Sequence, residues 1–290
     1  MASRTPMRIG AYALRVRDLD RCLAFYQRAV GLELIGRDPG NATLGNAGVP
    51  LLHLEHRPDA GPDDKTTAGL FHTAFAMPTR QDLADWYAHA QRIALTITRT
   101  GDHLVNEAIY FDDPEGNGGE CYADRSPESW LWNADGSCEI TTGKLVDLDA
   151  LAREATGAAE WRPPAGLRIG HINVRVGDTD AAEDFYCNAV GLDHTGRRTI
   201  EVAGEPKTIT FMSSGRYHHH VAANDFTSRG AGPREPERAG LSWFAIEVAD
   251  VEMLDRVRAR LRAAGAPIAP LSSGFETQDP WNTRVRFVAA

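Results

Sequence analysis

The feature that most constrains this chain is an internal repeat of a strand followed by a helix. The stretch MRIGAYALRVRDLDRCLAFYQRAVGLEL, which begins at Met7, matches LRIGHINVRVGDTDAAEDFYCNAVGLDH, which begins at Leu167, without a gap. Repetition at a fixed spacing indicates duplicated structural units. We therefore expect two copies of one fold. The pairs that coincide include Arg8/Arg168, Gly10/Gly170, Asp18/Asp178, Phe25/Phe185, Tyr26/Tyr186 and Gly31/Gly191.

Both copies predict the same local structure. An apolar alternation that ends at Asp18 or Asp178 is typical of a strand. The helix that follows carries a Phe-Tyr pair on its apolar face, and a glycine ends it.

Each half also contains a second, shorter strand–helix unit, which begins at Gly69 or Gly240. Short strands and an Asp-Pro turn follow it, in YFDDPEGNGGECYAD and QDPWNTRVRFVA. We therefore predict an α+β protein of four βαβββ modules, two per domain, with domains at residues 7–125 and 165–290. The connector, residues 126–164, carries a short helix signal in DLDALAREA and extended prolines in WRPPAG.

Charge and cysteine content restrict the partners and the compartment. Of 290 residues, 40 are acidic and 31 basic, for a net charge of −9, and no basic stripe appears. This argues against nucleic acid or an anionic membrane as a partner. The sequence lacks a secretory signal and an apolar run that would span a bilayer. Its four cysteines are scattered without a CxxC pair. We expect a cytoplasmic protein with reduced thiols, for which a homodimer is one option.

The repeated strand–Phe-Tyr–Gly-Leu units, the DPEGNGGECYADR ending and the GRYHHHVAAN stretch resemble the vicinal-oxygen-chelate superfamily. This superfamily includes glyoxalases, bleomycin resistance proteins and extradiol dioxygenases. The chain looks most like its two-domain, catechol 2,3-dioxygenase-like branch, over nearly its whole length apart from the connector. The resemblance implies that the modules pair into cupped mixed sheets. It does not settle the activity, because one fold hosts several chemistries.

The resemblance also implies where metal ligands lie: on the first and fourth strands of one module and the first and last strands of its partner. Neither half alone supplies a complete set: the first half has Ala11 at one position, and the second has Arg286, which stays protonated and cannot act as a ligand. Pairing the third module with the second gives His171, His220, His72 and Glu120. Pairing the first with the fourth gives Ala11, His53, Trp243 and Arg286. We therefore predict one metal site built across the two halves, and one degenerate site.

Within the complete set, we assign His72, His171 and Glu120 to the metal. Two imidazoles and one carboxylate with open positions are typical of non-haem Fe(II) oxygenases. We expect Fe(II), with Mn, Ni or Zn as alternatives. His220 takes the place where an extradiol dioxygenase holds its acid–base histidine, although a role as a further ligand stays open.

Tyr110 stands ten residues before Glu120, as the active-site tyrosine does in extradiol enzymes, and would hydrogen-bond to a substrate oxygen. Strand alternation places these two residues on adjacent strands. Alternation would also put His218 and His220 on one face of their strand and His219 on the other. We assign substrate contacts to Asn173, His218, His103 and Asn224, and we expect Cys121 to point into the core. Asn173 stands where the branch commonly has a histidine.

The resulting functional prediction is extradiol ring cleavage of a small catechol-like aromatic, with O2 as the second substrate. Another metal-dependent enzyme of the superfamily, an isomerase or lyase of the glyoxalase type, is one alternative. A protein that binds a small molecule without turnover is the other. Substrate-dependent oxygen uptake separates the first reading from both alternatives.

Overall fold

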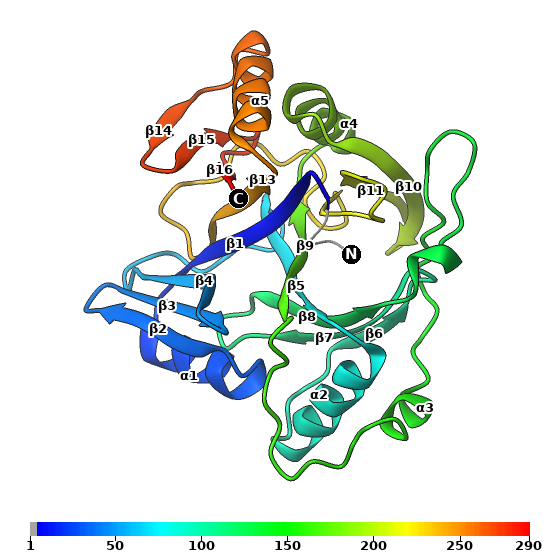
Figure 1. Cartoon of the computed structure of the whole chain (residues 1–290). Helices are drawn as coiled ribbons and strands as arrows, with labels where there is room; N and C mark the ends of the chain where they lie inside the picture. The colour runs from blue at the N-terminus through cyan, green and yellow to red at the C-terminus, as the bar shows by residue number, and fades with distance from the viewer. Residues whose placement is uncertain (1–4) are drawn as a thin grey trace.

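The computed structural model describes residues 5–290, and these form four modules with the same element order (Figure 1). Each module is a strand, a helix and three further strands, as the repeat predicts. The first module contains β1 Met7–Val16, α1 Leu19–Ala29, β2 Glu33–Asp38, β3 Asn41–Asn46 and β4 Val49–His56. The second contains β5 Gly69–Met77, α2 Arg80–Arg92, β6 Arg99–Asp102, β7 Asn106–Asp112 and β8 Gly118–Asp124.

The second half repeats this order after a connector that contains η2 Pro127–Ser129 and α3 Leu148–Ala152. The third module contains β9 Arg168–Arg175, α4 Thr179–Glu183, η3 Asp184–Val190, β10 Asp193–Val202, β11 Glu205–Ser213 and β12 Val221–Asn224. The fourth contains β13 Gly240–Val248, α5 Val251–Ala263, β14 Ala269–Leu271, β15 Gly274–Gln278 and β16 Arg284–Ala289.

The modules pair across the two halves of the sequence to form two eight-stranded mixed sheets. One sheet has the order β14-β15-β16-β13-β1-β4-β3-β2, and the other has the order β10-β11-β12-β9-β5-β8-β7-β6. At the centre of each, first strands pair antiparallel, β1 with β13 and β5 with β9. The α+β fold of four modules and their pairing, third with second and first with fourth, are therefore confirmed.

The predicted helix boundaries follow from side-chain caps and glycines. The carboxylates of Asp18 and Asp178 accept backbone N–H groups at the starts of α1 and α4. Gly31 and Gly191 end the two helical segments with φ values of 75° and 105°, which favour glycine. The second copy departs from the first, since its regular α-helix ends at Glu183 and continues as the π-helical segment η3.

The repeated tyrosine ties the two modules of each half together. The Tyr26 hydroxyl donates to Oδ2 of Asp113 at 3.1 Å, and the Tyr186 hydroxyl donates to Oδ2 of Asp279 at 3.0 Å. Each aspartate belongs to the Asp-Pro turn of the neighbouring module. These contacts between helix and turn therefore join modules of the same sequence half, whereas each sheet joins modules from different halves. The boundaries at 7–125 and 165–290 therefore stay a prediction about domains.

The connector contains the predicted short helix and also packs against the second sheet. The helix is α3, and the segment that contacts the sheet precedes it. Residues 138–145, which we call the connector flap, hydrogen-bond to that sheet through Cys138 N–H to the Thr195 carbonyl at 2.7 Å and Asp102 N–H to the Lys144 carbonyl at 2.8 Å. Ile140 is buried against Phe211 and Val105 in one apolar cluster. Among residues 5–290, no helix is long and apolar enough to cross a membrane.

Candidate metal centre

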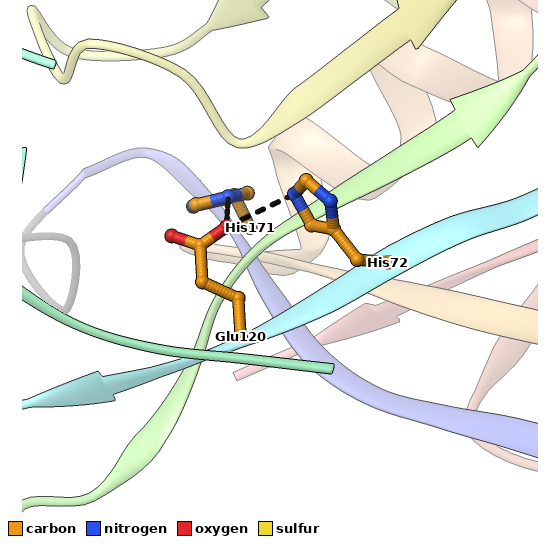
Figure 2. Close-up of side chains that lie close together, drawn as sticks. All are labelled: His72, Glu120 and His171. Atoms are coloured by element: carbon orange, nitrogen blue, oxygen red, sulfur yellow. Dashed lines mark ion pairs between the residues drawn. The ribbon is translucent and has the colours of Figure 1, made fainter. Parts of the chain in front are cut away.

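Three adjacent strands of the second sheet bring His72, Glu120 and His171 together (Figure 2). His72 lies on β5, Glu120 on β8 and His171 on β9, and the sheet order places β5 between the other two strands. The Nε2 atoms of His72 and His171 lie 3.0 and 3.3 Å from the same carboxylate oxygen, Oε2 of Glu120. The cross-half pairing thus assembles the predicted ligand set in one place.

Strand register explains why these side chains converge. Ala74 of β5 lies opposite both His171 and Glu120 on its two neighbouring strands. The β5–β9 ladder is interrupted between Leu70 and His72 and again between Ala74 and Phe75. Such irregularities redirect side chains near functional sites, and here they accompany the convergence of the two imidazoles on one carboxylate.

The group has the electrostatic character of a cation site. All three side chains are buried, and burial lowers the pKa of His72 to about 4, which keeps this imidazole neutral near pH 7. Burial alone would raise the pKa of Glu120, but His171 and His72 outweigh it and hold that pKa well below its ordinary value. A neutral imidazole and an ionised carboxylate are the forms that bind metals.

Unsatisfied polar atoms test whether a metal fits. Among residues 5–290, neither carboxylate oxygen of Glu120 accepts a hydrogen bond of good geometry. Buried polar groups without partners cost free energy unless an ion or water satisfies them. Within the described chain, these three residues are the only group of three or more His, Cys, Asp or Glu with ligand atoms all within 4.8 Å. The donor set therefore fits a divalent metal.

The equivalent place in the first sheet is filled by side chains instead. Trp243 is buried beside His53, with ring centroids 5.1 Å apart, and the guanidinium of Arg286 lies 3.9 Å from the centre of the Trp243 ring. Nε of Arg286 donates to Glu276 at 2.8 Å, and His53 contacts the Thr43 hydroxyl at 3.1 Å. A tryptophan and a cation occupy this cup, which agrees with the predicted degenerate site.

A cavity of about 380 Å³ opens at the three ligand residues. This volume lies within the range of pockets that enclose small ligands. The polar residues of its wall include His103, Tyr110, Asn173 and His219. Its apolar residues come from both halves and from the connector flap; they are Phe71, Ile140, Leu145, Ile200, Ile209, Phe211 and Phe226.

Tyr110 faces this cavity from the strand beside Glu120. The two residues are register partners on β7 and β8, as strand alternation predicts. The Tyr110 hydroxyl lies 2.8 Å from Nε2 of His103, and Nδ1 of His103 lies 2.7 Å from the Thr141 carbonyl. Since a carbonyl only accepts, Nδ1 of His103 donates and Nε2 accepts from the tyrosine. Burial raises the pKa of Tyr110 well above its ordinary value, so its hydroxyl keeps its proton as a donor.

Asn173 and Asn224 form a pair rather than two independent contacts. Asn173 lines the cavity, and its Oδ1 accepts a hydrogen bond from Nδ2 of Asn224 at 2.9 Å. Asn224 is fully buried behind it and is absent from the cavity wall. Asn173 can therefore contact a bound ligand, and the hydrogen bond from Asn224 orients the Asn173 side chain.

His220 does not line the cavity, and the structure differs from the expectation in which face of residues 218–220 points into it. Its Nδ1 lies 2.8 Å from the Ser213 hydroxyl, and its Nε2 lies 3.2 Å from the Thr5 hydroxyl. The backbone bends before strand β12 begins at Val221, and His219 rather than its two neighbours points to the cavity.

His219 instead lines the cavity, with its ring centroid 4.2 Å from that of His171. His218 lies behind His219 and does not line the cavity either. The run of three histidines could have pointed to His219 if no strand had been assumed there. No sequence pattern in residues 138–145 indicates that the connector flap lines the cavity.

The buried histidines predict acid lability of the metal-free protein. Burial lowers the pKa of His72, His218, His219 and His220 below the ordinary value of 6.5, to about 4 for His72. As pH falls from 6.5 towards 4, the unfolded chain therefore binds protons that the folded chain does not. Each histidine with a large shift should contribute up to about 1.4 kcal/mol per pH unit to the loss of stability.

We expect the denaturation midpoint of metal-free protein to be clearly lower at pH 5.5 than at pH 7.5. Urea titrations at both values measure this difference. His220→Gln should show a smaller difference, because the glutamine can still bond to Ser213 but does not titrate. Equal midpoints at the two pH values would contradict the prediction.

Known proteins resemble this chain over most of its length. The model of the Glyoxalase/Bleomycin resistance protein/Dioxygenase superfamily matches residues 8–120 and 168–278. A catechol-2,3-dioxygenase of Bacillus subtilis (strain 168) is 34% identical over 274 residues, which cover 94% of this chain and 93% of that protein. Biphenyl-2,3-diol 1,2-dioxygenase 3 of Rhodococcus globerulus is 27% identical over 113 residues, or 38% of this chain and 60% of that protein.

A solved structure shares the fold at lower sequence identity. Glyoxalase I from Zea mays superposes with a TM-score of 0.61 at 19% identity, over 99% of this chain and 94% of that chain. This likeness concerns the architecture alone. The matched family model and the full-length relative agree with the four-module fold. The chain therefore belongs to the glyoxalase/bleomycin resistance protein/dioxygenase superfamily.

Proposed function

We propose that this protein is an extradiol ring-cleaving dioxygenase that uses Fe(II) and O2 to open a small catechol-like aromatic. The observation that carries the proposal is the buried group of His72, Glu120 and His171 at the wall of a cavity of about 380 Å³. Two imidazoles and one carboxylate with open positions suit non-haem Fe(II). The full-length relative described as a catechol-2,3-dioxygenase supports the same reaction.

The residues of the cavity have distinct roles in this proposal. A divalent metal held by the three ligands would lower the pKa of the two adjacent hydroxyls of a catechol and supply the redox chemistry with O2. His219, which replaces His220 in the acid–base role, would accept a proton from the substrate and return it. The Tyr110 hydroxyl and the Asn173 amide would orient the substrate oxygens. The apolar wall would hold the ring and exclude water.

The cavity disfavours a glyoxalase-type reaction. Such an isomerisation usually relies on a carboxylate base beside the metal. Among the described residues that line the cavity, Glu120 is the only acidic one, and it belongs to the ligand set. Proton transfer by a group outside the ligand set would therefore use an imidazole, which suits the ring-cleaving reaction.

The four cysteines, all free, agree with the proposed cytoplasmic location, and we retain a homodimer as part of the proposal.

Metal content and oxygen uptake test the proposal together. We expect anaerobically purified protein to hold about one iron per chain by plasma mass spectrometry, and to consume O2 only when a catechol is added. His53→Gln should leave both results unchanged, because His53 lies in the degenerate cup, at the position equivalent to His220. Manganese, nickel or zinc without oxygen uptake would keep the site and reject the reaction. Stoichiometric ligand binding with neither metal nor product would reject an enzymatic role.

His219→Gln should lower kcat by about 10²–10⁴-fold, the usual contribution of a positioned acid–base group. Metal content should stay the same, because His219 is outside the ligand set. Steady-state oxygen uptake and metal analysis of the same preparation measure both quantities. His220→Gln is the matched control and should reduce kcat much less. The opposite order of the two variants would return the acid–base role to His220.

A further inference from the structure

A chain of buried side chains leads from the end of β8 to His219. Nε2 of His218 lies 2.8 Å from Oδ1 of Asp124, and Nδ1 of His218 lies 2.7 Å from Nδ1 of His219. The side chain of His218 is completely buried, and that of Asp124 is 19% exposed. Neither Asp124 nor His218 lines the cavity, so neither can touch a substrate directly.

Asp124 is itself held in place. Its second oxygen, Oδ2, accepts a hydrogen bond from the Tyr217 hydroxyl at 2.9 Å, and the Tyr217 hydroxyl lies 2.7 Å from that of Tyr122. Glu120, Tyr122 and Asp124 alternate along β8 and therefore share one face of the strand. The strand that supplies a metal ligand thus also anchors the histidine chain.

The hydrogen-bond chemistry of this chain selects one tautomer of His219. A carboxylate only accepts, so Nε2 of His218 must carry a proton that it donates to Asp124. A neutral His218 then has a lone pair at Nδ1. The Nδ1–Nδ1 contact at 2.7 Å requires a single proton between the two atoms, and this proton belongs to His219. Nε2 of His219 is consequently left without a proton, as an acceptor.

This free nitrogen is the one that can face the cavity. Among residues 5–290, no hydrogen-bond partner lies at Nε2 of His219, and the ring forms part of the cavity wall. We propose that Asp124 and His218 are positioning residues that hold His219 in the Nδ1-protonated tautomer, with Nε2 ready to accept a proton from the substrate. This inference rests on the proposed function for its effect on catalysis, but the tautomer itself can be measured independently of activity.

Two substitutions of His218 separate hydrogen bonding from packing. His218→Phe keeps an aromatic ring against Trp130 and Tyr217 but removes both nitrogens. In His218→Gln the side-chain amide can donate to Asp124 and accept from His219 at the same time. We expect His218→Phe to lower kcat by about 10–100-fold with KM and metal content unchanged, by analogy with the hydrogen-bond partners that orient metal-bound histidines. If kcat falls about 100-fold in His218→Phe, we expect it to fall no more than about ten-fold in His218→Gln.

The tautomer is read from the ring nitrogen-15 resonances of histidine-labelled, full-length protein, metal-free and after Zn2+ is added. We expect a protonated Nδ1 and a bare Nε2 at His219 in the natural sequence, and loss of this preference in His218→Phe. A protonated Nε2 at His219 would overturn the inference even if the protein cleaves catechols. So would a kcat that is higher in His218→Phe than in His218→Gln, since packing would then be the only role. Absence of ring cleavage with the expected tautomer would overturn the proposed function alone.

Discussion

Glu120→Gln should empty the metal centre and abolish oxygen uptake. The substitution keeps the shape of the side chain but removes the one negative charge that faces His72 and His171. Two neutral imidazoles and an amide bind a divalent cation far more weakly, because no ligand then offsets its charge. Activity should fall by more than the approximately 10²–10⁴-fold expected for an acid–base residue, since every step depends on the metal.

Plasma mass spectrometry on anaerobically reconstituted protein measures the metal directly. The glutamine amide can donate to an imidazole nitrogen, so we expect the variant to fold, with a denaturation midpoint close to that of the metal-free parent. Glu160→Gln is a suitable control, because it removes an exposed carboxylate from the connector. If Glu120→Gln still binds one iron per chain, Glu120 is not a metal ligand, and the ligand set predicted here is wrong.

The sequence predicted the ligand group because its information is local and repeated. The offset between Met7 and Leu167 shows which strands are equivalent, and the resemblance to the superfamily implies which positions on them carry ligands. With the cross-half pairing that the resemblance also allows, these positions give one complete ligand set and one set ending in Trp243 and Arg286. The structure has this pairing, and Trp243 fills the cup in which no ligand set exists.

The proposed acid–base position at His219 could not be read from the sequence for a physical reason. Alternation along a strand is a reliable guide only while the backbone stays extended. At His218–His220 the chain bends before β12, so one residue enters the cavity and its neighbours take buried hydrogen-bonding roles. The contribution of the connector flap was also invisible, because its packing on the sheet depends on long-range contacts such as that between Ile140 and Phe211.

The strands that carry the two histidine ligands are joined by a buried ion pair. Both oxygens of Asp63 contact Nη2 of Arg175, at 3.0 and 2.9 Å, and Arg234 lies 3.6 Å from the same carboxylate. All three side chains are nearly inaccessible, with exposures of 3%, 2% and 8%. Arg175 belongs to β9, as does His171, and Asp63 lies just before β5, which carries His72. Asp63 therefore links the parts of the chain that position the metal centre.

Asp63→Asn should destabilise the protein by about 3–5 kcal/mol, the usual cost of leaving buried charges without their partner. Burial raises the pKa of Asp63, but Arg175 and Lys65 outweigh it and keep that pKa below its ordinary value. Burial also lowers the pKa of Arg234 to about 10, so this guanidinium remains charged at pH 7. The neutral asparagine would leave Arg175 and Arg234 without the carboxylate that they face. Urea denaturation at pH 7 measures the effect, with Asp59→Asn, an exposed aspartate in the same segment, as the control. If both variants unfold at the same urea concentration, Asp63 does not hold these strands together. The backbone hydrogen bonds between β5, β8 and β9 would then be what positions the site.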